Sequence, residues 1–210
     1  HIFLIISTCL LGLNLVFSPI AAAIELPQKE LYTGHKLIDK WNTQAAEQYA
    51  NNLLKKYPKS GDAYFLKART EFLKGNHEIA WKILKQVTSN HNEVREFKNL
   101  IYNTYEETKL FTTSESKHFI YRYQKGPDEI LVHYATQALE KSYETLGNIL
   151  NYYPKEKVLV EFYPNQKSLS KVSPLTLDDI TISGTVALCK YNRIMLISPG
   201  SLIRGYNWMD

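Results

Sequence analysis

Histidine, cysteine and acidic residues are the natural starting point in a search for chemistry. The histidines that follow the N-terminal segment are scattered, and none begins the pattern His-Glu-x-x-His that places two zinc ligands on one helical face; they are His35, His77, His91, His118 and His133. The sequence also has no phosphate-binding glycine loop, nucleophile elbow or distinctive pair of carboxylates. We therefore predict no catalytic residue and no metal ligand within it.

Three single residues remain candidates. Glu161 interrupts an apolar strand and could be a functional carboxylate, but a surface-facing position at alternating spacing is the simpler interpretation. Cys189 precedes Lys190 and could be reactive, yet no His or Asn context accompanies it. His133 falls within a helical pattern, where an exposed or hydrogen-bonded histidine is expected more often than a ligand.

Composition narrows the class of protein. The 210 residues are 44% hydrophobic, which suffices for a globular core. The net charge is +4, but the 25 Lys and Arg are interspersed with 21 Asp and Glu. This pattern argues against nucleic acid as the main partner. The 15 tyrosines are interpreted as packing residues whose rings fill space between helices and whose hydroxyl groups reach solvent.

Residues 1–23 have the features of a signal peptide. The segment Ile2–Phe17 is almost unbroken apolar sequence, and Ser18-Pro19 and then Ala21-Ala22-Ala23 follow it. We expect cleavage after Ala23 and an exported protein, which is periplasmic, secreted or membrane-anchored; an uncleaved anchor stays open as an alternative. Because the sequence starts at His1 without a basic region, we expect it to be a fragment. Cleavage would leave Cys189 as the only cysteine, so no internal disulfide is expected.

Residues 24–111 show helical periodicity with a spacing of 34 positions. Small or apolar residues recur at this spacing in the pairs Ala46 and Ala80, Ala50 and Leu84, Leu53 and Val87, and Gly34 and Ala68. This pattern resembles the tetratricopeptide repeat. We predict one repeat over Glu30–Pro58, a second over Gly61–Asn92, and a closing helix over Glu93–Leu110.

Two residues depart from this repeat pattern, and they leave a second fold open. Lys67 occupies a usually apolar position, and Trp41 stands where Gly is usual. A plain helical hairpin bundle is therefore the alternative fold. The concave face of the repeats could bind a protein partner or only pack on the neighbouring domain.

Residues 117–210 have a different pattern, after a polar linker predicted over residues 112–116. The overall expectation is α+β: all-α helical hairpins followed by a small mixed sheet with one long helix. That helix keeps apolar spacing from Leu131 to Leu150 and ends before Pro154. Residues 173–183 read as a loop, and residues 202–210 as the start of another element. The expected strands are Lys117–Tyr123, Val158–Tyr163, Val186–Tyr191 and Arg193–Ser198, with a short helix over Gln166–Val172 and a hairpin turn at Asn192.

The segment from Ser116 to Asp210 resembles the N-terminal part of the peptidase MA-like domain, which is found fused to tetratricopeptide repeats in bacterial exported proteins. The likeness rests on Lys117-His118-Phe119, Tyr121-Arg122-Tyr123, the long helix ending at Tyr153-Pro154, Val158-Leu159-Val160-Glu161-Phe162-Tyr163-Pro164, Gly184-Thr185-Val186-Ala187, Arg193-Ile194-Met195-Leu196-Ile197-Ser198-Pro199 and Tyr206-Asn207-Trp208.

The resemblance implies a gluzincin zinc peptidase, whose His-Glu-x-x-His helix would begin only beyond Asp210. It implies that an edge strand at Ala187, Leu188 and Cys189 pairs with an extended peptide substrate. Zinc is then expected in the full-length protein only, and this fragment is expected to be inactive by itself. The alternative is an exported, non-enzymatic tetratricopeptide-repeat adaptor that binds a protein or peptide.

Overall fold

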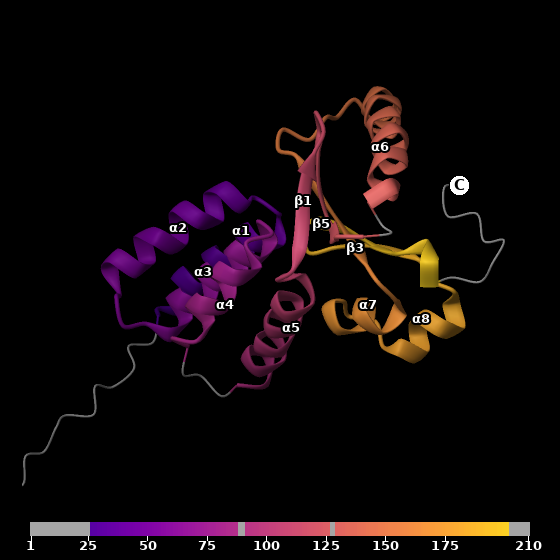
Figure 1. The fold of residues 1–210 in the computed structure, drawn as a ribbon. Helices are drawn as coiled ribbons and strands as arrows, with labels where there is room; N and C mark the ends of the chain where they lie inside the picture. The colour runs from indigo at the N-terminus through magenta and orange to yellow at the C-terminus, as the bar shows by residue number, and fades with distance from the viewer. Residues whose placement is uncertain (1–25, 88–90, 127–128, 202–210) are drawn as a thin grey trace, which may run out of the picture.

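The computed structural model describes residues 26–87, 91–126 and 129–201, which form a helical part followed by a sheet with helices on both faces (Figure 1). The expected α+β fold class is confirmed. Two predictions lie outside the described residues: the signal peptide with its cleavage site at Ala23, and the element expected over residues 202–210.

The helical part consists of five helices: α1 (Gln28–Asp39), α2 (Thr43–Lys56), α3 (Gly61–Leu73), α4 (His77–Leu84) and α5 (Asn92–Thr108). The Asn42 and Ser60 side chains accept hydrogen bonds from backbone N–H groups in the first turns of α2 and α3, and so fix where these helices begin. The bounds agree with two helical hairpins and a closing helix. Among the described residues, no helix has both the length and the apolar character to span a bilayer.

The turns that end α1 and α3 are structural equivalents, 34 residues apart. Both close by the same pair of backbone hydrogen bonds, in which a residue in left-handed conformation and its successor donate to carbonyls of the last turn. These bonds are Trp41 to Ile38 and Asn42 to Leu37 in the first repeat, and Gly75 to Phe72 and Asn76 to Glu71 in the second. The left-handed residue is Trp41 (φ 58°) in one turn and Gly75 (φ 79°) in the other.

Small residues let the repeat helices approach closely. The predicted core positions Ala46, Ala50, Ala80 and Leu84 are all 0% exposed. Gly34 meets α3 so closely that a Cβ added there would lie 2.3 Å from Leu66 Cδ2. The close packing predicted from the repeat spacing is therefore present.

The second part is a five-stranded mixed sheet. Its elements in chain order are β1 (Phe111–Glu115), β2 (Phe119–Gln124), α6 (Glu129–Leu150), β3 (Val158–Tyr163), α7 (Gln166–Val172), α8 (Leu177–Ser183), β4 (Ala187–Lys190), β5 (Arg193–Ile197) and the short helix η1 (Pro199–Ser201). The strand order is β1-β2-β3-β5-β4. Strand β3 pairs in parallel with β2 and β5, whereas β1 and β4 are antiparallel edge strands.

Two segments differ from the sequence prediction. Residues 112–116, expected to be a linker, lie mostly in β1, because their Thr and Ser side chains suit a half-exposed edge strand. Residues 173–183, expected to be a loop, contain α8. A capping box between Thr176 and Asp179 starts that helix, and Gly184 in left-handed conformation ends it.

Helices cover both faces of the sheet (Figure 1). Helix α6 lies on one face, over Phe119, Tyr121 and Phe162, while α7 and α8 cover the other face beside Met195. The buried residues of α6 end at Gly147. Three side chains near the end of the helix that were expected in its apolar stripe are exposed instead: Leu146, Ile149 and Leu150.

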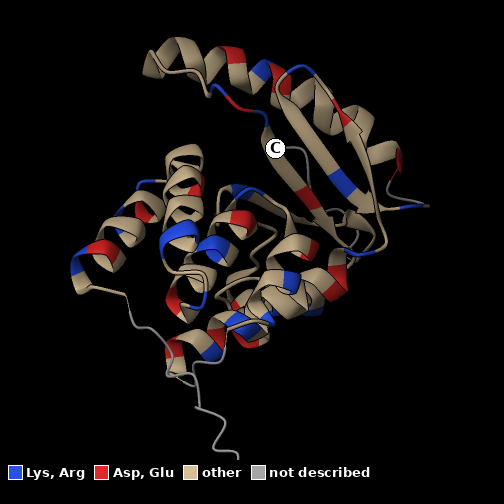
Figure 2. Cartoon of the chain, turned by 90° about the vertical axis from the view of Figure 1, so that its left-hand side faces the viewer, with Lys and Arg blue, Asp and Glu red and all other residues tan. Residues whose placement is uncertain are grey.

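Charged residues are dispersed over the molecule. In the view of Figure 2, Lys and Arg alternate with Asp and Glu over both the helices and the sheet, and neither sign occupies a whole face. This agrees with the interspersed charges of the sequence.

Candidate functional site

The three residues expected to bind substrate lie on β4, at one edge of the sheet. Strand β4 pairs with β5 through Ala187 with Leu196, Leu188 with Met195, and Cys189 with Ile194. Within the described residues, no strand pairs with the other side of β4. Ala187 and Cys189 are exposed, and Leu188 packs against the core beneath α7 and α8.

The pairing pattern of the hairpin shows which backbone groups face outward. The Ile197 N–H donates to the Val186 carbonyl, so these two residues form a hydrogen-bonded pair. Hydrogen-bonded and non-hydrogen-bonded pairs alternate in an antiparallel ladder, so the backbone N–H and C=O groups of Leu188 face β5. The N–H and C=O groups of Ala187 and Cys189 therefore point outward from the edge of the sheet, away from β5. The β4 edge thus presents the donors and acceptors that an added strand requires.

Glu161 is not on the surface, and the surface-facing interpretation is wrong. It lies on β3 and is 0% exposed. Alternation fails as a guide here because β3 is the central strand of a sheet with helices on both faces, so both sets of its side chains are buried.

The Glu161 carboxylate joins the sheet to the repeats. His77, the first residue of α4, places Nε2 2.7 Å from Glu161 Oε1. From the sheet, the Tyr163 hydroxyl donates to Oε2 at 2.6 Å, and Arg193 Nε lies 2.9 Å from the same oxygen. Arg122 Nη1 lies 3.5 Å from Oε1. We call these five residues the Glu161 cluster.

The Glu161 cluster holds a buried ionised carboxylate. Burial alone raises the pKa of Glu161, but electrostatic interactions with His77 and Arg193, together with hydrogen bonds from His77 and Tyr163, outweigh it and hold that pKa well below its ordinary value. Burial lowers the pKa of His77 although Glu161 opposes this, so we assign a neutral imidazole that donates its Nε2 hydrogen. Burial and Glu161 both raise the pKa of Tyr163.

Arg193 connects β5 to α3 mainly through its flat faces. Its guanidinium carbon lies 4.6 Å from the ring centroid of Phe72 and 5.6 Å from that of Tyr191. Its Nε is close to Glu161, but the N–H does not point at the oxygen, so none of its three nitrogens has a well-directed acceptor in the described part of the chain. The contact with Glu161 is therefore chiefly ionic.

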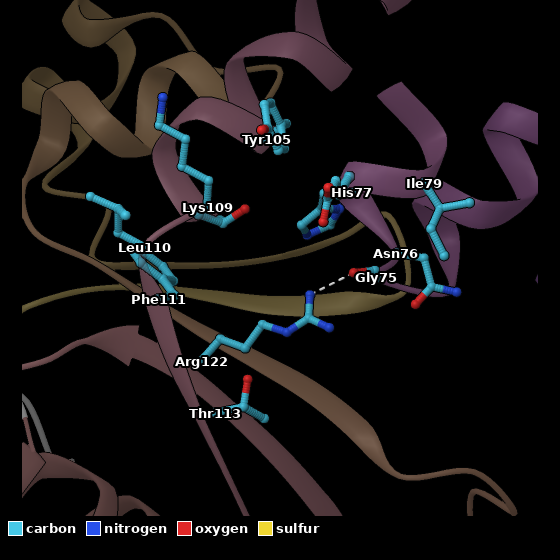
Figure 3. Close-up of a pocket in the computed structure, with 12 residues that line it drawn as sticks. Gly75, Asn76, His77, Ile79, Tyr105, Lys109, Leu110, Phe111, Thr113 and Arg122 are labelled. Carbon is cyan, nitrogen blue, oxygen red and sulfur yellow. Dashed lines mark hydrogen bonds between the residues drawn. The ribbon is translucent and has the colours of Figure 1, made fainter. Parts of the chain in front are cut away.

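Further hydrogen bonds fix the α3–α4 turn on the sheet. Arg122 Nη1 donates to the Gly75 carbonyl at 2.5 Å, as Figure 3 shows, and Asn192 Nδ2 donates to the Leu73 carbonyl at 3.2 Å. A cavity of about 580 Å³ lies beside this contact, between the start of α4, the end of α5 and strands β1 and β2. Figure 3 shows Arg122 crossing this cavity toward the α4 turn.

The remaining candidates have ordinary surroundings. His133 is exposed and bonds to Gln137, as expected. Cys189 is a free thiol. Over the described ranges, no group of three or more His, Cys, Asp and Glu side chains could hold a metal ion.

The sequence analysis missed the Glu161 cluster, because its members come from four separate elements. One signal was available: an acidic residue in a strand of otherwise apolar and aromatic residues requires a partner if that strand is central.

Helical hairpins with equivalent turns 34 residues apart, closed by a further helix, define a tetratricopeptide-type repeat protein. Residues 3–125 match the family described as Iml2/Tetratricopeptide repeat protein 39. This match covers more than half of the chain, including α1 to α5 and both β1 and β2, and the chain belongs to this family. No curated protein and no solved structure matches it.

Proposed function

We propose that this chain is a protein-binding module whose β4 edge receives an extended peptide by main-chain pairing. Repeats of the tetratricopeptide type generally mediate protein–protein interactions. The observation that carries the proposal is the outward N–H and C=O groups of Ala187 and Cys189 on an edge strand. The Glu161 cluster supports it, because it fixes the repeats against the same sheet.

Part of the repeat surface is already occupied from within the chain. Tyr191, in the turn between β4 and β5, packs against Phe72 of α3 at a ring separation of 5.4 Å. The adjoining Arg193 stacks on the same ring. Helix α3 of the repeats therefore packs against the β4–β5 hairpin. The free edge of β4 is then better placed than this part of the repeat surface to receive an extended ligand.

A proline substitution tests pairing at β4. Cys189→Pro removes an outward N–H and spares the bonds to β5, because proline is tolerated where the N–H of an edge strand faces solvent. The matched control Cys189→Ser keeps the N–H. A fluorescein-labelled peptide of alternating Thr and Val should bind the native chain and the Ser variant, and anisotropy should show about tenfold weaker binding to the Pro variant. Equal binding by the native chain and both variants would refute main-chain pairing at β4.

A second candidate function is the N-terminal part of a zinc metallopeptidase of the peptidase MA-like type. One observation favours it: the strand that the resemblance assigns to substrate, Ala187 to Cys189, is an open edge strand. The described residues offer no zinc ligand set, so we derive no step through zinc. We propose zinc for the full-length protein only and no peptidase activity for this chain alone. A full-length product without stoichiometric zinc would leave the non-enzymatic adaptor.

Export is part of the proposal. The apolar segment Ile2–Phe17 followed by Ala21-Ala22-Ala23 supports a signal peptide removed after Ala23. Expression with the native N-terminus in a bacterial host should yield a product outside the cytoplasm whose first residue, by mass spectrometry, is Ile24. An uncleaved product in the membrane fraction would favour the anchor, and an uncleaved soluble product would refute export.

A further inference from the structure

A groove of about 610 Å³ lies where the turn between α1 and α2 faces the loop between α6 and β3. Residues 40–44 come from the α1–α2 turn and the start of α2, and residues 152–158 come from the α6–β3 loop and the first residue of β3. The only β4–β5 hairpin residue that lines it is Asn192. The groove is therefore a surface separate from the β4 edge, and it is shared by the repeats and the sheet domain.

Three large aromatic side chains line this groove and remain exposed. Trp41 is 49% exposed, Tyr152 67% and Tyr153 41%. They come from both parts of the chain, since Trp41 follows α1 and the two tyrosines follow α6. Aromatic side chains gathered in a concave surface are typical anchors for a bound partner.

Trp41 adopts a backbone conformation that is unfavourable for tryptophan. Its φ of 58° lies in the left-handed region, and the equivalent residue of the second repeat is Gly75. Such a conformation costs a non-glycine residue about 1 kcal/mol or more. The Trp41 side chain does not offset this by packing in the repeat core, because it belongs to neither core cluster of the repeats. Its presence at a glycine position needs another explanation.

The groove carries more positive than negative side chains. Lys40, Lys155 and Lys157 line it and are exposed, whereas Glu156 is its only acidic lining residue. Lys157 is paired with Glu115 at 2.7 Å. Lys40 and Lys155 form no ion pair with any described residue, so both ammonium groups are available to a ligand.

We propose that this groove binds an acidic segment of a partner protein, in which an aromatic or aliphatic side chain stands beside carboxylates. The apolar side chain packs between Trp41 and the two tyrosines, and the carboxylates pair with Lys40 and Lys155. A concave groove between two loops fits a peptide segment better than a flat lipid surface. This site goes beyond the proposed pairing at β4, which involves other residues and no side-chain charge.

The internal repeat provides the decisive variant. Trp41→Gly restores the residue that the second repeat uses in the same turn, so it should relieve strain and raise the melting temperature. The same change removes a binding anchor and should weaken ligand binding at least about tenfold. A purely structural role of Trp41 would not give a more stable protein that binds less.

The ligand probe is a phage-displayed library of random dodecapeptides. Selection on the native chain, with counter-selection on the Trp41→Gly variant, should enrich peptides that combine Asp or Glu with an aromatic or aliphatic residue. Synthetic copies should bind less tightly to Lys155→Glu, while Lys59→Glu, a charge change at an exposed site away from the groove, should bind as the native chain does. Cys189→Pro should also bind normally, which separates this site from the β4 edge.

Three results would overturn the proposal. One is a failure to enrich any peptide that depends on Trp41. Another is enrichment of peptides that lack acidic residues. The third is Trp41-dependent binding to phosphatidylglycerol vesicles without peptide binding, which would assign the groove to a membrane surface instead.

Discussion

Glu161 is surrounded by groups of opposite or neutral charge from both parts of the chain. Its pKa lies below the ordinary value of 4.5, so its contribution to stability is complete above about pH 4.5 and is lost as pH falls through the lower, folded-state pKa. If Glu161 is replaced by Gln, Arg193 stays fully buried without its counter-ion. Removing one partner of a buried ion pair costs about 3 to 5 kcal/mol.

We therefore expect Glu161→Gln to lower the free energy of unfolding by about 3 kcal/mol at pH 7 and to reduce the loss of stability on acidification. Urea unfolding followed by circular dichroism at pH 7 and at about pH 2.5 measures both effects, because the contribution of Glu161 is lost well below pH 4.5. Glu78→Gln is the control, because Glu78 pairs with Lys82 at the surface, and it should change little. A Glu161 variant as stable as the native chain would show that the cluster contributes no net stability.

The first repeat depends on the close approach of α1 to α3. Gly34→Ala would place a methyl group 2.3 Å from Leu66 Cδ2, whereas a methyl group at Gly61 meets nothing within 4 Å. Overpacking of this kind costs about 1 to 3 kcal/mol. Gly34→Ala should therefore be destabilised by that amount in thermal unfolding, and Gly61→Ala should be neutral or slightly stabilised. Leu66→Ala should lower the free energy of unfolding less in the Gly34→Ala background than in the native chain. Strictly additive losses would exclude the predicted contact between residue 34 and Leu66.

Periodicity predicted the helices and strands well, because it reflects local burial. The spacing of 34 positions located both repeats, and the apolar run around Tyr163 located β3. The surroundings of Glu161 escaped prediction because they depend on the central place of β3 in the sheet and on His77 of α4, 84 positions away in the sequence. Strand β1 escaped because its polar side chains suit an edge, and α8 because its signal was a capping box rather than an apolar stripe.

At the scale of the whole molecule, the repeats and the sheet share one interface. The Glu161 cluster, the hydrogen bond from Arg122 to Gly75, and the stacking of Arg193 on Phe72 all cross it. Helix α5 adds contacts with α7, including the ion pair between Lys171 and Glu107. Because separation would take the hydrogen bond of His77 from Glu161, that of the Gly75 carbonyl from Arg122 and the Phe72 ring from Arg193, neither part can detach at low cost.

We therefore expect the two parts to unfold together. In a Trp208→Phe, Cys9→Ser background, Trp41 and Trp81 report on the repeats, and a fluorophore attached to the free thiol of Cys189 reports on the sheet. The two urea transitions should coincide in midpoint and slope, as a two-state transition requires. Separate midpoints in this background would show that the interface is too weak to couple the parts. The two transitions should have separate midpoints in the Glu161→Gln variant, because that change removes the carboxylate that accepts the hydrogen bond from His77 of α4 and pairs with Arg193 of β5.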